Sequence, residues 1–155
     1  MNRFVIIMAA LLLAIACNTN KSGDNTNEET RKKAADLQKQ YDERKGVGKF
    51  TQVDINPSID ITMVTAGNKI YDVKCASCHK LSSEKLVGPG WKGVTERREP
   101  VWVMNFITNT EEMLTKDPAL QSQLEICMVK MPNQNLTDTD ARNVYEFMRK
   151  NDTNK

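Results

Sequence analysis

The chain has 155 residues, which is enough for one domain with additional segments. Its 22 basic and 20 acidic residues nearly cancel, and this balance excludes nucleic acid as the main partner, because phosphate binding needs a net basic face. Only 6% of the residues are aromatic, which is lean for a core without further support.

The first sixteen residues resemble an export signal. Arg3 supplies a positive charge, and the apolar run at 4–16 is too short to cross a bilayer comfortably. The run ends in Leu-Ala-Ile-Ala before Cys17, which is similar to a bacterial lipobox. We therefore predict a lipoprotein signal peptide at 1–16, acylation of Cys17, and a place in the bacterial cell envelope, lipid-anchored and facing the periplasm. An ordinary signal peptide with an incidental cysteine is the alternative.

A polar segment separates this signal from the predicted domain. Residues 18–30 offer no apolar side chain to bury, which predicts disorder. The densely charged residues 28–45 form either a solvated helix or a partly disordered spacer. We predict a disordered or partly helical tether over 17–60, a globular domain over 61–151 and a disordered tail at 152–155.

Apolar residues recur at three- and four-residue steps within the domain and predict four helices. The expected helices start at Thr62, Pro100, Pro118 and Thr137. Proline is favoured in the first turn of a helix, and Asp60 (or Thr62), Asp117 and Thr137 are suitable capping residues. We find no convincing strand or repeat and predict an all-α domain.

The motif Cys75-x-x-Cys78-His79 follows the first predicted helix. This spacing predicts covalent haem attachment, because two thiols three positions apart can add to the two vinyl groups on one edge of a haem. His79 then places an imidazole against the iron. It is the chain's single histidine, so its position directly after the second cysteine is a specific signal.

Three other chemistries share part of this pattern. A thioredoxin-type redox pair opens a helix after a strand, whereas Cys75 and Cys78 end a helix. A zinc site that adds Cys127 would need the adjacent Cys78 and His79 to bind one ion together, which is strained. A Cys75–Cys78 disulfide would close a short loop and stabilise little. Cys127 is otherwise a buried or partner-facing thiol with no derivable role.

The second axial ligand of the iron must be another residue type, because there is no second histidine. Among eight methionines we predict Met131, which lies in a loop ahead of the last helix and is followed by the stiffening Pro132. Met128, near the end of a helix, is the alternative. Three further methionines at helical spacing are expected to fill the core: Met104, Met113 and Met148.

From Gly67 to Met148 the chain resembles a class I cytochrome c. The matching segments are Gly67–Tyr71, Cys75–His79, Gly88-Pro89, Met131-Pro132 and Val144–Met148. The resemblance implies four or five helices around one covalent haem c. It implies that Gly67 lets the last helix approach the first, with Phe147 or Tyr145 filling the contact, and that the Pro89 carbonyl accepts a hydrogen bond from His79. Candidates to face the haem or its propionates are Trp91, Trp102, Arg97 and Arg98, and a solvated loop is the alternative for the arginines.

Ligation by His79 and Met131 would leave no open iron position for a substrate, which predicts outer-sphere electron transfer and not an enzyme. We predict a membrane-anchored monomer that carries single electrons from a quinol-oxidising complex to a terminal reductase or oxidase. A nitrous oxide reductase-like enzyme and a cytochrome c oxidase are both candidates for the acceptor. The alternatives are a haem-based sensor or peroxidase-like enzyme with a labile Met131, and a haem-bearing structural subunit of a larger redox complex.

Overall fold

The computed structural model describes residues 28–32 and 41–153, and the chain divides into two units, residues 1–39 and 40–155. In the first unit, residues 28–32 are helical and exposed, within the segment where the sequence predicts either a helix or a spacer. The predicted signal peptide and Cys17 lie outside the described residues. Within the described ranges, no helix combines the length and apolar character needed to cross a membrane.

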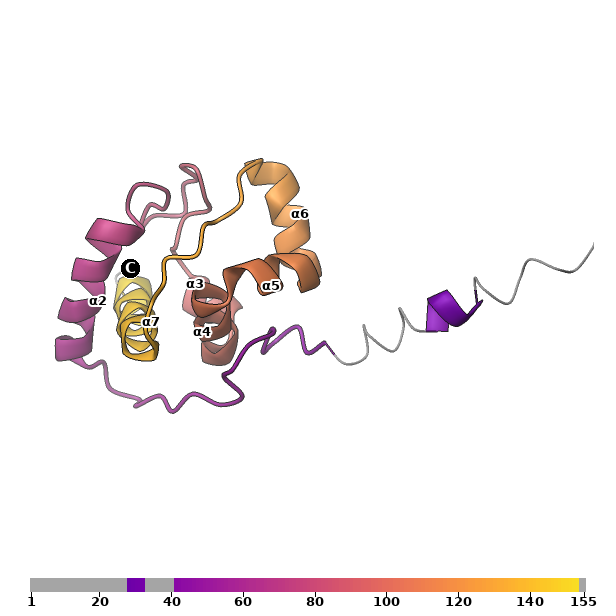
Figure 1. Cartoon of the computed structure of the whole chain (residues 1–155). Helices are drawn as coiled ribbons and strands as arrows, with labels where there is room; N and C mark the ends of the chain where they lie inside the picture. The colour runs from indigo at the N-terminus through magenta and orange to yellow at the C-terminus, as the bar shows by residue number, and fades with distance from the viewer. Residues whose placement is uncertain (1–27, 33–40, 154–155) are drawn as a thin grey trace, which may run out of the picture. The chain divides into compact units, whose positions relative to one another are not determined.

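The second unit is helical (Figure 1). Its helices are α2 (Ile61–Lys74), α3 (Val94–Arg97), α4 (Pro100–Thr108), α5 (Thr110–Lys116), α6 (Pro118–Cys127) and α7 (Asp138–Thr153). The four helices predicted from the sequence, α2, α4, α6 and α7, begin within one residue of their predicted starts. Helices α3 and α5 were not predicted, because 4 and 7 residues are too few to show an apolar periodicity.

The predicted capping residues explain where the helices begin. Asp60 and Asp117 each accept two backbone N–H groups from the first turns of α2 and α6. Thr137 and Asp140 form the predicted reciprocal box, in which the Asp140 N–H donates to the Thr137 hydroxyl (3.1 Å) and the Thr137 N–H donates to the Asp140 carboxylate (3.1 Å). Because such caps satisfy otherwise unpaired N–H groups, each contributes about 1 kcal/mol.

Helices α2 and α7 pack closely where they cross, at Gly67. A β-carbon at this position would collide with the Asn143 carbonyl and lie 2.8 Å from Cβ of Phe147. The Phe147 ring also lies 5.4 Å from the Tyr71 ring, between ring centroids. The predicted close approach at Gly67 is therefore confirmed, and Phe147 lies at the contact.

The N-terminal strap, residues 41–59, packs against the domain, so the predicted disordered or partly helical tether over 17–60 does not hold for these residues. In Figure 1 it runs beneath α4 to the start of α2. The buried Asn105 side chain accepts the Phe50 N–H (3.0 Å) and donates to the carbonyls of Lys45 and Phe50 (both 2.9 Å). Apolar strap residues that pack against the core are Val47, Phe50, Val53 and Ile55. Their spacing fits neither a helix nor a strict strand, which is why the sequence pattern missed them.

A buried carboxylate joins the end of the strap to α7. The Glu146 side chain is fully buried and accepts hydrogen bonds from Arg142 (2.6 Å), Arg149 (2.8 Å) and the Asp60 N–H (3.1 Å). Burial by itself would raise the pKa of Glu146, but these three donors hold it below its ordinary value of 4.5. The ionised carboxylate thus fixes the start of α2 against α7.

Helix α7 extends two residues beyond the predicted domain end at 151. Asp152 accepts hydrogen bonds from the Gly93 N–H (2.6 Å), the Thr95 N–H (2.9 Å) and the Thr95 hydroxyl (2.7 Å). The predicted disordered tail is therefore wrong for residues 152 and 153, because these hydrogen bonds tie the last turn of α7 to α3. Residues 154–155 lie outside the described residues.

Candidate haem site

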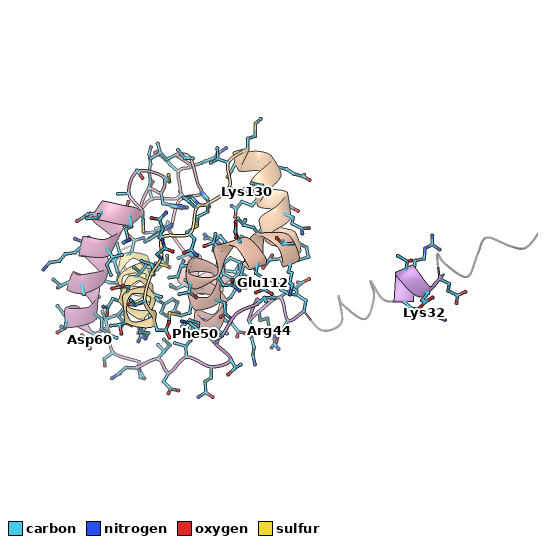
Figure 2. All side chains as sticks on the ribbon, in the orientation of Figure 1. Lys32, Arg44, Phe50, Asp60, Glu112 and Lys130 are labelled. Carbon is cyan, nitrogen blue, oxygen red and sulfur yellow. The ribbon has the colours of Figure 1, made fainter. Side chains whose placement is uncertain are left out.

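A cavity of about 780 Å³ lies within the second unit. This volume falls in the range of roughly 300–1,000 Å³ that is typical of cofactor sites. Its walls come from α4, α6 and α7, from the segment 73–91, and from the methionine loop, residues 128–137, which connects α6 to α7. In Figure 2, Lys130 marks the α6 end of this loop. Most lining side chains are apolar, and no Asp or Glu of the described residues lines the cavity.

The attachment motif lies where α2 ends. Cys75 caps the helix, with its N–H bonded to the Tyr71 carbonyl (2.9 Å). The chain then turns, because the N–H groups of Cys78 (3.0 Å) and His79 (2.9 Å) both donate to the Cys75 carbonyl. This turn places both thiols and the imidazole in one cavity wall. The motif therefore ends a helix, as predicted.

The thiol chemistry fits haem attachment better than the alternatives. Cys75 and Cys78 are free thiols, and burial raises the pKa of Cys75 to about 11. A reactive redox pair needs a lowered thiol pKa, so this environment does not suit one. Within residues 28–32 and 41–153, no group of three His, Cys, Asp or Glu residues could hold a metal ion. Cys127 is a partly exposed free thiol that lines the cavity at the end of α6.

His79 is oriented by the loop that follows it. Its Nδ1 lies 2.8 Å from the Pro89 carbonyl oxygen, so the predicted hydrogen bond is present. Burial lowers the pKa of His79, and the hydrogen bond to Pro89 opposes this shift. A neutral ring with its proton on Nδ1 leaves the Nε2 lone pair available to iron. Gly88 permits the close approach, because a β-carbon there would lie 2.9 Å from Nδ1.

Two aromatic side chains, those of Tyr71 and Trp91, contact His79. The Tyr71 hydroxyl donates to the His79 carbonyl (2.7 Å), and the Tyr71 ring lies 5.0 Å from the ring of Trp91. Trp91 is buried, lines the cavity as predicted, and lies 5.7 Å from the His79 ring. This role of Tyr71 was not predicted, although its position four residues before Cys75 on the buried face of α2 was a usable signal.

Met131 lines the same cavity as His79 and is partly buried. Met128 is 87% exposed, adopts a left-handed backbone conformation at the end of α6 and does not line the cavity. The structure therefore favours Met131 over Met128 as the second iron ligand. The three methionines predicted to fill the core are all buried: Met104, Met113 and Met148.

Trp102 lines the cavity but directs its polar group elsewhere. Its indole N–H donates to the Asp117 carboxylate (2.7 Å), which also accepts the Tyr41 hydroxyl (2.5 Å). The indole N–H is therefore bonded to Asp117 and is not available to a haem propionate. The guanidinium of Arg98 lies 4.2 Å from the centre of the Trp102 ring, while Arg97 donates to the Lys92 carbonyl (2.8 Å). Both arginines line the cavity, as predicted for pocket residues.

The residues present fit a covalently attached haem. Cys75 and Cys78 would hold the porphyrin edge, and His79 and Met131 offer an imidazole and a thioether to the iron. Basic residues that line the cavity and could meet the propionates are Arg97, Arg98 and Lys130. Most of the remaining lining is apolar, as a porphyrin requires, with a few neutral polar residues among it: Ser77, Ser122, Gln123 and Gln134.

Comparisons with known proteins agree with this chemistry. The family model described as cytochrome c matches residues 64–152. Among solved structures, the chain is similar to a cytochrome c from Rhodothermus marinus, with 29% identity and a TM-score of 0.67 over 70% of this chain and 92% of that one.

Two structures of one engineered cytochrome c from Rhodothermus marinus are also similar to the chain. The variant Rma TDE has 28% identity and a TM-score of 0.66, and the same variant bound to a carbene intermediate has a TM-score of 0.63; each match covers 69% of this chain and 92% of the other. The comparison with curated proteins gave no match.

The family model covers more than half of the chain, and the matched region contains the attachment motif, the cavity and Met131. The predicted class I fold is confirmed, as is one covalently bound haem c, since the chain carries a single attachment motif. A general role as a haem c electron carrier follows from the same match. This chain is a member of the cytochrome c family.

Proposed function

We propose that the protein is a lipid-anchored carrier that passes single electrons from a quinol-oxidising complex to a terminal reductase or oxidase. The observation that carries this proposal is the presence of His79 and Met131 in the walls of one apolar cavity. With both side chains on the iron, no position is left for a substrate, so the protein exchanges electrons and not atoms.

The chain's own residues favour fast electron exchange. When bound, haem c supplies an iron that alternates between the ferrous and ferric states. A thioether ligand from Met131 favours the ferrous state. A mostly apolar lining, with no carboxylate among the residues that the structure describes, disfavours the additional positive charge of the ferric state. The hydrogen bonds of His79 to Pro89 and Tyr71 hold the ligand in one orientation, which limits reorganisation between the two states.

The surface around the cavity supports contact with other proteins. Exposed apolar residues at or next to the cavity lining are Val73, Leu86, Val87, Ile126, Met128 and Val129. Exposed apolar residues gathered around a cofactor site commonly mark an interaction surface. Docking of a redox partner at this patch would bring the partner's cofactor close to the haem.

The proposed lipid anchor would keep the protein close to its redox partners. Acylation of Cys17 would hold the protein at a membrane, and residues 18–40 connect this cysteine to the strap. A tethered domain reaches membrane-bound enzymes at a high effective concentration, which favours repeated short encounters over tight binding.

Ligation is tested by producing the full chain in a host that matures c-type cytochromes. We expect haem to stay attached in a denaturing gel and the oxidised protein to show the methionine–iron charge-transfer band. Met131→Ala should lose the band, whereas the matched control Met128→Ala should keep it. A high-spin spectrum without the band in the unmodified protein would instead favour the sensor or peroxidase-like alternative.

The anchor and the route of electrons need separate measurements. Wild-type protein should incorporate radiolabelled fatty acid and sediment with membranes, while Cys17→Ala should do neither. Stopped-flow mixing with membranes that contain a quinol-oxidising complex should reduce the haem rapidly, and a terminal reductase or oxidase should re-oxidise it. Slow transfer in both directions would favour a structural subunit over a carrier.

A further inference from the structure

The methionine loop has little regular structure of its own. Residues 128–137 form no helix or strand, and their hydrogen bonds to one another are short-range. The Gln134 side chain donates to the Pro132 carbonyl (3.2 Å), and the Asn135 N–H donates to the Asn133 side chain (2.8 Å). Such contacts shape the loop but do not fix it in relation to the opposite wall of the cavity. The position of Met131 therefore depends on contacts made from outside the loop.

One such contact comes from the residue before the attachment motif. Lys74 is the last residue of α2 and directly precedes Cys75. Its ammonium group donates to the Gln134 carbonyl at 2.9 Å. Gln134 lies three residues after Met131, so this hydrogen bond ties the far side of the methionine loop to the cysteine that holds the haem edge.

The second contact comes from the other side of the motif. Lys85 pairs with His79 in an isolated antiparallel β-bridge. Its ammonium group donates to the Ile126 carbonyl at 2.9 Å. Ile126 lies in the last turn of α6, where carbonyl groups lack a helical partner and the helix dipole favours a positive charge. This hydrogen bond fixes the helix end that leads into the methionine loop.

The two lysines thus connect both ends of the attachment motif to both sides of Met131. We propose that Lys74 and Lys85 are positioning residues that clamp the methionine loop and keep the Met131 sulfur on the iron. The inference rests on the proposed ligation by Met131 and names the residues that maintain it. Both ammonium groups are at the surface, so each hydrogen bond to a backbone carbonyl has a modest effect, about three- to tenfold on the ligation equilibrium.

Exogenous imidazole measures this equilibrium directly in the oxidised holoprotein. Imidazole binds the iron only when Met131 has left it, so its apparent affinity rises with the fraction of protein in which the loop is open. We expect Lys74→Gln and Lys85→Gln each to raise the imidazole affinity about three- to tenfold, and the double variant to raise it further. The matched control is Lys69→Gln, which removes the same charge from an exposed position on α2 and should leave the affinity unchanged.

A general effect of surface charge would act equally at Lys69, whereas the clamp requires a hydrogen-bond donor at the two test positions. Lys74→Arg and Lys85→Arg retain a donor and should restore most of the wild-type affinity. Equal effects of Lys69→Gln and the two test variants, or wild-type affinity in both test variants, would overturn the clamp while ligation by Met131 stands. Absence of the methionine charge-transfer band from the wild-type protein would instead overturn the ligation, and the clamp with it.

Discussion

The crossing of α2 with α7 and the haem cavity beside it are stabilised in different ways. At the crossing, the chain's own groups satisfy one another: backbone approaches backbone at Gly67, and Glu146 is ionised among three donors. At the haem site, mostly apolar side chains line a cavity of about 780 Å³. Two largely irregular segments, residues 73–91 and the methionine loop, form much of its wall. The crossing therefore depends on protein contacts alone, whereas the cavity half of the core depends on the porphyrin.

Removal of the haem attachment should have the largest effect on stability, because the cavity depends on the porphyrin and the crossing does not. In the double variant Cys75→Ser, Cys78→Ser we expect no covalent haem and a loss of several kcal/mol of unfolding free energy, since ligand binding to the native state no longer stabilises it. Haem staining of denaturing gels and thermal unfolding followed by circular dichroism measure the two effects. Cys127→Ser should retain the haem, and equal instability of this variant would contradict the comparison.

The reverse experiment breaks the crossing and leaves the haem motif intact. Gly67→Val should lower the unfolding free energy of the holoprotein by about 3 kcal/mol, because the new side chain would collide with the Asn143 carbonyl, which cannot move without shifting α7. Urea unfolding of the haem-loaded protein measures this loss. Thr65→Val, on an exposed position of the same helix, should change stability by less than about 0.5 kcal/mol.

The buried carboxylate makes the crossing sensitive to acid. The pKa of Glu146 is lowered in the folded protein, so its contribution is complete above its ordinary value of 4.5 and is lost as the pH falls through the lowered value. Glu146→Gln should cost about 3 kcal/mol near pH 7, since it leaves Arg142 and Arg149 without their buried partner. Urea unfolding between pH 7 and pH 3 should show the two proteins converging in acid. Glu125→Gln, on the exposed face of α6, should instead follow the wild-type curve.

Apart from long-range pairs such as Gly67 with Phe147, which the cytochrome c resemblance implied, and His79 with Met131, the parts of the molecule that the sequence predicted are defined by neighbouring residues. Asp60, Asp117 and Thr137 cap helices a few positions away, and Cys75 and His79 belong to one short motif. Each signal lies within a few residues of the structure that it specifies, so a single sequence was sufficient.

Apart from the short helices α3 and α5 and the role of Tyr71, the missed parts are defined by partners distant in the chain. The strap was assigned to the tether because its apolar residues are irregularly spaced, and Asn105, which binds Phe50, lies 55 residues away. Lys74 and Lys85 contact carbonyls 60 and 41 residues away, and a lysine in a sequence carries no sign of such a partner. Periodicity and motifs record local geometry, whereas these contacts are consequences of the assembled fold.

The smallest expected effect tests the beginning of the strap. Tyr41 donates a hydrogen bond to Asp117, whose carboxylate keeps the Trp102 indole and two backbone N–H groups after the hydroxyl is removed. Because Asp117 is not left without partners, Tyr41→Phe should cost only about 1 kcal/mol. The loss should be local, with faster amide exchange in the strap and an unchanged methionine charge-transfer band. Tyr145→Phe, a buried tyrosine on α7, is the matched control and should leave amide exchange in the strap at its wild-type rate. Global unfolding in Tyr41→Phe would show instead that the strap belongs to the same cooperative unit as the crossing.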